Sequence, residues 1–471
     1  MPHPSLKEGV IHLDPGSFRD PSGGIFIHGD RVYRYFTQRG ASDFRAVAES
    51  GLLDELAKSG AVVTTHSVSE EEFATLGRAV PNISLVVEHP RLPFISYVYE
   101  WSFEMLKVAA LLYLRVLRAA LERGFVLKDA TTYNIQFVGP EPVFIDIGSF
   151  EPYEEGMPWA AYAQFCRMFL NPLLLQSMTG VSFHAWMRSS LEGIAPGDLS
   201  RVLSLRSKLR RTVLVNVVLQ AWLNRRFARA SHASHMVSTH RINKKDVLRL
   251  VERLDKAVRG LKRRRSDSPW SKYERESSYS PEAQKKKEEF LERAIMYEKP
   301  NVVWDLGCNT GRYSIIASRH AGNVLAFDSD TEVIDILYQK VRSDHPNILP
   351  LAVDLLNPSP DQGWSQGERL GLSNRGPADF VLCLALLHHL VIAGNVPMSH
   401  FIRWLASISK SGVIEFVPKS DVMAQELLRW RKDVYDGYGS AEFEAALAEH
   451  FRIIRQQTLP DSDRILYHFS R

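Results

Sequence analysis

Apolar residues recur along the chain at two spacings, every second position in some stretches and every third or fourth in others. IFIHGDRVYRYF has two apolar-rich runs on either side of His28–Asp30, which predicts a hairpin with glycine in its turn. ISLVVEHPRLPFISYVYEW predicts two short strands broken at Pro90–Pro93. The spacing predicts helices over Ser42–Lys58 and over Ser102–Arg123, and Gly124 ends the second of them.

The pattern changes character twice, and we expect domain boundaries there. Two short apolar runs follow Gly124, and further helical stretches lead up to residue 230. We expect an α+β domain over residues 1–230, with a β-rich lobe over about 20–100 and a helical lobe over 101–230. A basic, breaker-rich stretch predicts a helical linker over 231–289. Strands and helices then alternate over 290–471, which is typical of a parallel α/β sheet.

The stretch NVVWDLGCNTGRYSIIASRHA carries the clearest chemistry. It predicts a buried strand ending at Asp305, a tight turn from Gly307 to Gly311 and then a helix. Glycines after a strand let the backbone approach a ligand closely. The second strand of this region ends at Asp328, where a carboxylate can accept hydrogen bonds from both ribose hydroxyls of a nucleoside. A third strand ends near Asp354.

Asp305-Leu-Gly-Cys-Asn-Thr-Gly311, Asp328, Asp354 and Asp379-Phe-Val-Leu-Cys383 together resemble the class I S-adenosylmethionine-dependent methyltransferases. The resemblance covers roughly residues 290–471 and implies a Rossmann-like, seven-stranded sheet whose last strand is antiparallel. It implies S-adenosylmethionine as cofactor, with the glycine turn under its methionine part, Asp328 on the ribose and Asp354 at the adenine. The implied cofactor site comprises Asp305, Gly307, Asn309, Gly311, Asp328, Asp354 and Leu384.

Asn309 stands where this family commonly has a middle glycine, and asparagine tolerates left-handed backbone better than most residues. The nearest rival is a dinucleotide-binding oxidoreductase, in which Ser314 would be a small residue opening the helix. The late position of the motif, with no catalytic domain after it, disfavours that rival.

Methyl transfer to a hydroxyl or to some amines requires removal of a proton. His388 and His389 follow the fourth strand, and either is a candidate general base because histidine titrates near neutrality. Alternatively, one histidine packs and the other caps a helix. Glu415 is a candidate for binding the acceptor, or for an ion pair with Lys419 or Arg429. Trp364, in the long loop 357–377, either folds over the substrate or packs.

A second motif lies in the N-terminal part. Lys128-Asp129-Ala-Thr-Thr-Tyr-Asn134, followed by Phe144-Ile-Asp146-Ile-Gly148, resembles the catalytic and metal-binding loops of protein-kinase-like phosphotransferases. The resemblance implies Asp129 as the base, Asn134 and Asp146 as ligands of Mg²⁺, and Mg-ATP as cofactor. Leu127 departs from the family's histidine, no glycine-rich loop is visible and only Arg34 could replace the strand lysine. A regulatory pseudokinase and an unrelated α+β domain stay open.

Composition and charge set the remaining limits. The 471 residues are 45% hydrophobic and 24% charged, which excludes wholesale disorder and a fibrous repeat. No apolar run is long enough to span a membrane, and three scattered cysteines indicate a reducing cytoplasm. Residues 201–270 hold 19 Lys and Arg against 4 Asp and Glu. This basic stretch either binds nucleic acid or is neutralised by the acidic domains on either side of it.

Together these observations predict a cytoplasmic methyltransferase that modifies a small molecule or a metabolite-linked hydroxyl or amine, with no membrane partner. A bifunctional phosphotransferase, an RNA methyltransferase using the basic linker and a non-catalytic sensor of the cofactor are the alternatives. The sequence does not predict the oligomeric state.

Overall fold

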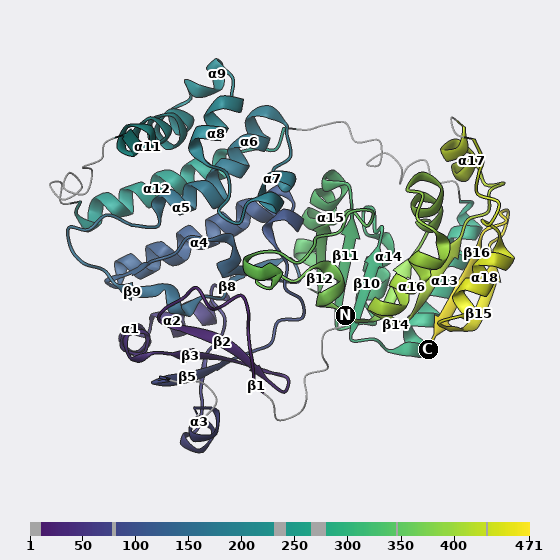
Figure 1. The fold of residues 1–471 in the computed structure, drawn as a ribbon, viewed down its shortest axis with the longest axis horizontal. Helices are drawn as coiled ribbons and strands as arrows, with labels where there is room; N and C mark the ends of the chain where they lie inside the picture. Colours follow the sequence, from purple (N-terminus) through teal and green to yellow (C-terminus); the bar gives the residue numbers. More distant parts are fainter. Residues whose placement is uncertain (1–10, 78–81, 230–241, 265–278, 345–346, 430–431) are drawn as a thin grey trace.

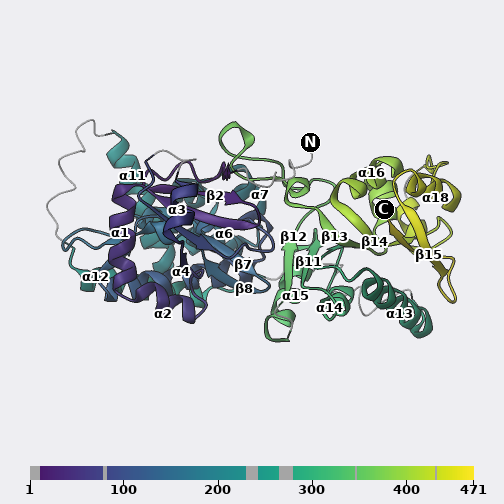
Figure 2. The same cartoon turned by 90° about the horizontal axis from the view of Figure 1, so that it is seen from below.

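A computed structural model describes residues 11–77, 82–229, 242–264, 279–344, 347–429 and 432–471. Two domains lie side by side along the long axis of the molecule (Figures 1 and 2). The last helix on the N-terminal side is α12 (Lys244–Gly260), and the C-terminal domain begins with α13 (Pro281–Glu298). No helix in these described ranges is long and apolar enough to cross a bilayer.

The N-terminal domain opens with a five-stranded antiparallel sheet in the order β1-β2-β3-β5-β4. The predicted hairpin is confirmed, because Ile27 pairs with Val32 and His28 with Arg31. The sheet contains β1 (Ile11–Leu13), β2 (Gly23–His28), β3 (Arg31–Phe36), β4 (His66–Ser67) and β5 (Leu85–His89). The helices beside it are α1 (Gln38–Glu49), α2 (Leu52–Lys58) and α3 (Glu70–Leu76).

Two of the N-terminal expectations need correction. The helix predicted over Ser42–Lys58 is two helices, because Gly51 between α1 and α2 has a left-handed φ of 73°. The prediction of a second strand in the ISLVVEHPRLPFISYVYEW stretch is also wrong. A short helix, η1 (Val98–Glu100), lies there instead, because the Glu100 carboxylate accepts a hydrogen bond from the Tyr97 N–H at 3.0 Å and closes a turn.

The long helix α4 (Phe103–Glu122) confirms the predicted helix over Ser102–Arg123 and runs through the centre of the helical lobe. Ser102 caps it by accepting a hydrogen bond from the N–H of Met105. Two antiparallel pairs follow, β6 (Phe125–Leu127) with β9 (Phe150–Pro152) and β7 (Ile135–Val138) with β8 (Glu141–Phe144). The remaining helical segments before α12 are η2 (Thr132–Asn134), η3 (Ile147–Ser149), α5 (Tyr162–Phe165), η4 (Cys166–Leu170), α6 (Asn171–Thr179), α7 (His184–Ser189), α8 (Pro196–Val202), α9 (Leu205–Lys208), α10 (Arg211–Val213), η5 (Leu214–Leu219) and α11 (Gln220–Arg229).

The C-terminal domain is a seven-stranded sheet in the order β12-β11-β10-β13-β14-β16-β15. The first five strands are parallel, and the last, β16, is antiparallel to both neighbours, as the resemblance implied. The strands are β10 (Val302–Leu306), β11 (Asn323–Asp328), β12 (Ile348–Ala352), β13 (Ala378–Cys383), β14 (Ser409–Phe416), β15 (Arg452–Thr458) and β16 (Ile465–Ser470). The expected methyltransferase-like α/β fold is confirmed.

Helices cover both faces of this sheet because alternate strand residues are buried on opposite sides. Val303 packs in a core with α13, whereas Trp304 packs in a second core on the other face. The helices are α14 (Arg312–Ser318), α15 (Thr331–Asp344), α16 (Met398–Ile408), α17 (Val422–Leu428) and α18 (Ser440–Ala448), with the short segments η8 (Trp364–Gln366), η9 (Leu372–Arg375) and η10 (His389–Ala393).

The two domains share one apolar core. Phe94, after β5, packs its ring against Trp304 and Phe327 of the C-terminal sheet, with ring centroids 5.9 and 6.2 Å apart. Next to these rings, the guanidinium of Arg375 forms a buried ion pair with Glu100, and both side chains are at most 3% exposed. The long loop before β13 therefore joins the domains.

The predicted linker over 231–289 is divided between the domains. Helix α12 packs along α4, and its side chains at 247, 251, 254 and 258 are buried. Helix α13 packs on the C-terminal sheet instead. Residues 231–241 and 265–278 of the predicted linker lie outside the described residues.

Candidate functional site

The glycine turn follows β10, the central strand, at the point where the strand order reverses. Strand β10 pairs with β11 on one side and with β13 on the other. In open α/β sheets, ligands bind outside the carboxyl ends of the strands at such a switch point. Gly307, Asn309 and Gly311 all have positive φ, at 79°, 49° and 80°. The turn therefore takes the left-handed conformation that the sequence analysis expected Asn309 to tolerate.

At two of these residues a side chain would meet a neighbour, closely at Gly311 and only slightly at Gly307. A Cβ on Gly311 would lie 2.2 Å from Cδ1 of Leu337 in α15. A Cβ on Gly307 would lie 3.3 Å from Cδ1 of Leu386, in the segment after β13. Leu386 therefore borders the turn.

Asp328, the last residue of β11, faces this turn. Its Oδ2 accepts a hydrogen bond from the N–H of Asn309 at 2.9 Å, and its Oδ1 accepts one from the N–H of Asp330 at 2.9 Å. Burial raises the pKa of Asp328, while the two backbone donors act in the opposite direction. Each carboxylate oxygen has a second lone pair, so the fixed side chain can still accept hydrogen bonds from a vicinal diol.

Asp305, on β10 below the turn, is fully buried. Its Oδ2 accepts a hydrogen bond from the hydroxyl of Ser314 in α14 at 2.6 Å. Burial is the largest cause that raises the pKa of Asp305 to about 7, and the nearby Asp328 raises it further. Ser314, which the sequence analysis weighed only as a small helix residue, is therefore the partner that holds this carboxyl group in place.

The other two residues of the expected cofactor site lie at neighbouring strand ends. Asp354, two residues beyond β12, is exposed, and its Oδ1 accepts a hydrogen bond from the N–H of Leu356 at 2.9 Å. Leu384 follows β13 directly and is buried. All seven predicted cofactor residues thus lie on β10, β11, β12 and β13 or in the loops at their carboxyl ends.

His388 and His389 begin the short helix after β13 and have different surroundings. His388 is 1% exposed, and in the described ranges neither of its ring nitrogens has a hydrogen-bond partner. Burial, the largest cause, lowers the pKa of His388 to about 3, and His389 acts in the same direction. His389 is half-buried, and burial lowers its pKa as well. The two ring centroids lie 4.2 Å apart.

Glu415, on β14, is fully buried in an ion pair, which is one of the two predicted alternatives, but its partners differ from the predicted ones. Its Oε2 accepts a hydrogen bond from Nζ of Lys287 at 2.7 Å, and its Oε1 accepts one from the hydroxyl of Tyr279 at 2.8 Å. The predicted partners were wrong, because Lys419 pairs with Asp433 and Arg429 pairs with Glu426.

Lys287, Tyr279 and Arg464 are the residues near the site that the sequence analysis missed. Arg464 lies 3.9 Å from Glu415 and pairs with Asp421 at 2.7 Å, and its guanidinium stacks on the ring of Tyr279. A signal for Lys287 was present in the sequence. It occupies the apolar stripe of α13, where the residues at 283, 290, 291, 294 and 295 are buried, and a lysine in such a stripe indicates a buried partner.

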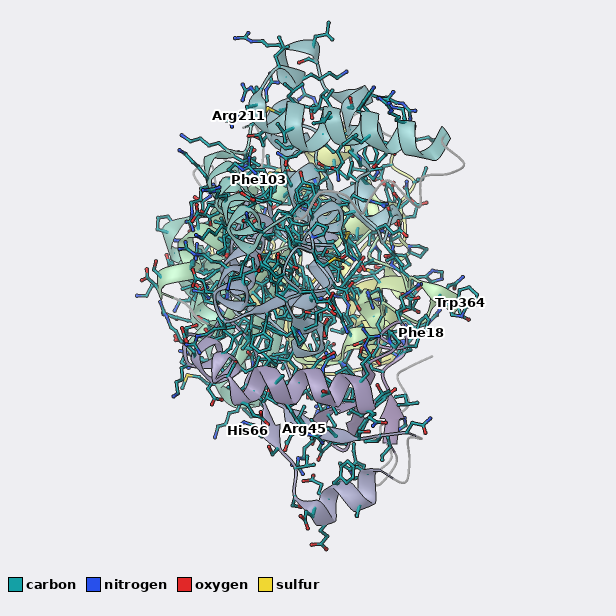
Figure 3. All side chains as sticks on the ribbon, turned by 90° about the vertical axis from the view of Figure 1, so that its left-hand side faces the viewer. Phe18, Arg45, His66, Phe103, Arg211 and Trp364 are labelled. Atoms are coloured by element: carbon teal, nitrogen blue, oxygen red, sulfur yellow. The ribbon has the colours of Figure 1, made fainter. Side chains whose placement is uncertain are left out.

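Trp364 does not pack, because it is 73% exposed and its side chain points outward at the edge of the molecule (Figure 3). The loop around it lies on the N-terminal domain instead. Glu368 accepts hydrogen bonds from Arg19, and the carbonyl oxygens of Asn357 and Pro358 accept hydrogen bonds from Arg188. The predicted packing of Trp364 is therefore wrong.

The structure brings together the N-terminal motif residues. The amide of Asn134 donates a hydrogen bond to Oδ2 of Asp146 at 3.0 Å, and Nη1 of Arg34 lies 3.0 Å from Oδ1 of the same carboxylate. Burial raises the pKa of Asp129, and the charge of Asp146 adds to the effect. Among the described residues, no group of three or more His, Cys, Asp or Glu side chains is arranged to hold a metal ion.

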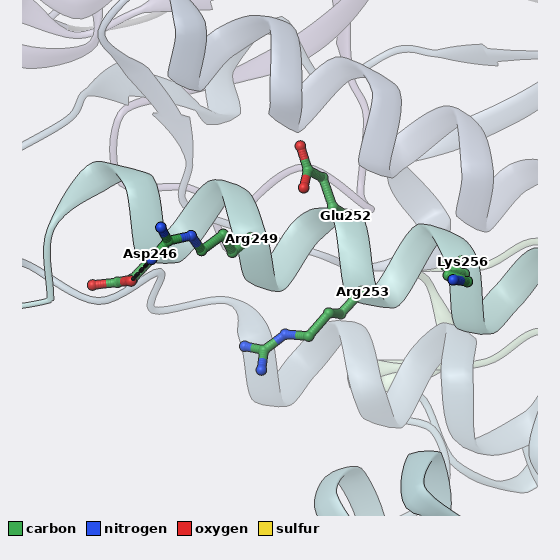
Figure 4. A pocket seen from close by; sticks show the side chains of 5 residues that line it. All are labelled: Asp246, Arg249, Glu252, Arg253 and Lys256. Carbon is green, nitrogen blue, oxygen red and sulfur yellow. Dashed lines mark hydrogen bonds and ion pairs between the residues drawn. The ribbon is translucent and has the colours of Figure 1, made fainter.

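The positive charge of the basic stretch 201–270 is partly neutralised by neighbouring acidic side chains. Helix α12 forms one side of an open hollow of about 550 Å³ lined by Asp246, Arg249, Glu252, Arg253 and Lys256, both signs together (Figure 4). Arg249 pairs with Asp246 at 3.0 Å. Beyond the helix, Arg263 is half-buried and pairs with Glu332 and Asp335 of α15, at 3.0 and 3.4 Å.

No protein-family model matches the chain. Among solved structures, the N-methyltransferase NodS from Bradyrhizobium japonicum WM9 is 15% identical, with a TM-score of 0.30, covering 41% of this chain and 98% of NodS. Magnesium protoporphyrin IX methyltransferase (ChlM) from Synechocystis PCC 6803, with bound S-adenosylhomocysteine, is 18% identical, with a TM-score of 0.30, covering 40% of this chain and 84% of ChlM.

A curated relative matches both domains. Nodulation protein NoeA from Rhizobium meliloti (strain 1021) is 37% identical over 461 residues. The match covers 97% of this chain and 95% of the relative, so it includes the N-terminal sheet, the helical lobe and the C-terminal sheet. The chain belongs to the family of nodulation protein NoeA.

Proposed function

We propose that the C-terminal domain is an S-adenosylmethionine-dependent methyltransferase. The observation that carries the proposal is the pair formed by Asp328 and the glycine turn. A carboxylate at the end of β11 is fixed by the N–H of Asn309, on a turn whose glycines at 307 and 311 have positive φ. A nucleoside needs such a carboxylate for its ribose, and close backbone approach needs such a turn.

The residues present fit this cofactor. Asp328 would hold the ribose, Gly307 and Gly311 would leave room beside the methionine part, and Asp354 would lie at the adenine. When bound, the cofactor supplies an electrophilic methyl group on a positively charged sulfur. The turn and Asp328 would hold the cofactor in a fixed orientation, with its methyl group towards the acceptor. Such positioning is a main contribution of a protein to an in-line displacement.

On the acceptor side, we propose His389 as the residue that takes the proton. A general base must meet the acceptor, and His389 is half-buried whereas His388 is 1% exposed. Burial lowers the pKa of His389, so its ring is neutral at pH 7 and able to accept a proton. His388 would support it from beneath, with ring centroids 4.2 Å apart. Glu415 would act indirectly, because Lys287 and Tyr279 already occupy its oxygens.

Calorimetric titration with S-adenosylmethionine and with S-adenosylhomocysteine tests the cofactor assignment. The wild-type protein should bind both. Asp328→Asn should weaken binding about 10- to 100-fold, because a hydrogen bond to a charged group contributes about 1.5–3 kcal/mol. Asp436→Asn, an exposed aspartate of the same domain, is the matched control and should bind normally. Absence of binding by the wild type, or equal affinity in both variants, would reject the proposal.

The acceptor is tested with labelled S-adenosylmethionine in fractionated host extract. We propose a small molecule or a metabolite-linked hydroxyl or amine, and the relative's name supports a role in nodulation. His389→Gln should lower the turnover about 100- to 10,000-fold. In the wild type, the rate should fall on the acid side below the ordinary histidine pKa. Unchanged turnover in a protein with alanine at both His388 and His389 would exclude both residues.

Label appearing in RNA would instead favour an RNA methyltransferase. That alternative has weaker support, because Arg263 and Arg249 of the basic stretch 201–270 are already paired with carboxylates.

The N-terminal domain carries a second candidate function, that of a kinase-like regulatory module without phosphotransfer. The supporting observation is the ion pair between Arg34 and Asp146. The positive charge of Arg34 already neutralises the carboxylate that a metal ion would otherwise bind. Lys128 likewise lies 3.3 Å from Asp20. Mg-ATP should then leave the melting temperature unchanged. A clear rise that Asp146→Ala abolishes would support an active phosphotransferase instead.

A further inference from the structure

The helical segments from α8 to α11 of the N-terminal domain expose a group of large apolar side chains to solvent. Leu205 and Leu209 are each 79% exposed, and Trp222 is 48% exposed. Large contiguous apolar areas on a soluble protein mark places where something else binds. We call the exposed apolar set of α8 to α11 the α9–α11 surface; its members are Val202, Leu205, Leu209, Leu214, Val215, Leu219 and Trp222.

These side chains belong to one structural unit. Helix α8 packs against η5 and α11, and α9 contacts α10. In η5 and α11 the exposed residues recur at 215, 219 and 222, along one side of the helical segment, whereas Val213, Val217 and Ala221 are buried on the opposite side. The segment therefore has two apolar faces, and the interior of the domain covers only one of them.

The same surface is strongly basic. The sequence has no Asp or Glu from Leu199 to Lys245. Arg201 in α8 is exposed and pairs with Asp198 at 3.0 Å. The surface has five other exposed arginines, and in the parts of the chain that the structure describes none of these has a carboxylate partner: Arg206, Arg210, Arg211, Arg225 and Arg226. Figure 3 shows Arg211 at this end of the molecule, where it reaches into solvent. The guanidinium of Arg226 stacks on the ring of Trp222 at 5.3 Å.

We propose that the α9–α11 surface docks onto an anionic lipid membrane. Leucine and tryptophan side chains flanked by arginines are the composition of helices that lie in a bilayer interface, where the apolar groups enter the acyl region and the cations meet lipid phosphates. Such docking needs no membrane-spanning helix. The expectation of no membrane partner rested on the absence of a span, so it does not address this surface.

RNA and a second copy of the chain are two other possible partners, and both match the α9–α11 surface less well than a membrane does. RNA would use the arginines, but it offers nothing to exposed leucine and valine, because single-stranded nucleic acid is bound by aromatic stacking and cations. A second copy of the chain would use the apolar side chains. In a two-fold interface, however, the same arginines would face each other with no acid of this surface between them. A membrane rich in anionic lipid accepts both kinds of group.

Vesicle flotation with the full-length protein tests the proposal. Vesicles of phosphatidylcholine mixed with phosphatidylglycerol should carry the protein upward, and vesicles of phosphatidylcholine alone should carry much less. The difference should shrink at high salt, because salt screens the arginines. Replacing both Arg210 and Arg211 with serine should weaken binding about fivefold for each arginine removed.

A second variant tests the apolar part with a matched control. Leu205→Glu with Leu209→Glu should lower vesicle binding by at least about tenfold, since charged groups resist burial in the bilayer. Val422→Glu with Val434→Glu makes the same change at exposed positions of the other domain, 76% and 63% exposed, and should bind vesicles like the wild type. Light scattering and cofactor titration on all three proteins show whether they stay monodisperse and folded.

Three outcomes would overturn the proposal. The first is the absence of binding to anionic vesicles by the wild type, and the second is equal binding by the Leu205/Leu209 variant. The third is a concentration-dependent dimer, or an RNA complex, that this variant abolishes while vesicles show no binding. None of these outcomes depends on methyl transfer, so the membrane proposal and the proposed enzyme activity fail separately.

Discussion

A single buried carboxyl group, that of Asp305, makes the region of the glycine turn sensitive to pH. Asp305 lies under the turn, held by the hydroxyl of Ser314, and its pKa is raised to about 7, chiefly by burial. Between the ordinary aspartate pKa and about 7, the folded protein keeps a proton that the unfolded chain releases. The stabilisation from this group is therefore complete at low pH and is lost as the pH rises through about 7.

Asp305→Asn should remove this pH dependence. Relative to the wild type, the variant should gain stability as the pH is raised from about 5 to 7.5, by up to about 1.4 kcal/mol per pH unit below the folded-state pKa. Melting temperatures across this range measure the effect. The exposed Asp436→Asn should follow the wild type at every pH. If the wild type and Asp305→Asn stay parallel, the pKa of Asp305 is not raised.

At the level of single residues, the sequence predicted the groups whose position follows from a strand end. Asp328 is an example, since a buried strand points its last residue at the cleft and the preceding strand supplies the glycine turn. The partners of Glu415 were not predictable in that way. Lys287 is 128 positions earlier in the chain, and only the packing of α13 on β14 brings the two together.

At the scale of helices and strands, the packing of α15 restricts which residue can occupy the glycine turn, because Leu337 of α15 lies directly against Gly311. Gly311→Ala would force a side chain into a left-handed residue, at about 1–2 kcal/mol, and into overlap with Leu337, at about 1–3 kcal/mol more. We expect a lower melting temperature and loss of cofactor binding. Gly197→Ala, in α8 with free space around it, is the control and should be neutral or slightly stabilising. A normally stable Gly311→Ala protein that binds the cofactor would contradict the close packing of α15 on the turn.

One buried ion pair, between Lys287 of α13 and Glu415 of β14, adds to the apolar packing that joins these two elements. The side chains of Lys287 and Glu415 are 1% and 0% exposed. Lys287→Met should destabilise the protein by about 3–5 kcal/mol, because it leaves a buried carboxylate without its closest cation. Adding Glu415→Leu should recover a large part of this loss, and denaturant unfolding of both single variants and the double variant measures the coupling. Strictly additive effects would show that the two groups act independently.

Most elements followed from the spacing of apolar residues. Six strands of the C-terminal sheet were predictable as short buried runs between polar turns, and α4 was predictable from its apolar face. The edge strand β15 is largely exposed, and its place follows from the resemblance rather than from burial. The strand predicted near Val98 failed because a hydrogen bond between Glu100 and Tyr97 closes a turn there. Apolar runs show burial, but local side-chain to backbone bonds decide the conformation.

For the whole molecule, the sequence predicted two domains and a linker but not how the domains join. The contacts that join them link distant segments, such as Phe94 with Trp304 and Arg263 with Glu332. The sequence pattern of each of these segments predicts burial or charge, but it does not predict which distant segment it contacts. Because the two domains share a continuous apolar core, we expect them to unfold together rather than one after the other.

The buried ion pair between Glu100 and Arg375 tests this coupling. Glu100 also accepts a hydrogen bond from Ser359, and the guanidinium of Arg375 stacks on Phe94 and Tyr97 at 4.7 and 4.8 Å. Arg375→Met should cost about 3–5 kcal/mol, because Glu100 stays buried without its cation. In scanning calorimetry, the single transition of the wild type should separate into two.

Arg342→Met supplies the comparison, since Arg342 also joins the domains but pairs with Glu141 on the surface, where the side chains are 46% and 60% exposed. An exposed pair contributes at most about 1 kcal/mol, so this variant should keep one transition at nearly the wild-type temperature. Two transitions in the wild type would mean that the shared core does not couple the domains. Equal behaviour of the two variants would mean that the coupling does not pass through Arg375. A single transition that only Arg375→Met divides would assign the coupling to the buried pair, which anchors the loop before β13 to the N-terminal domain.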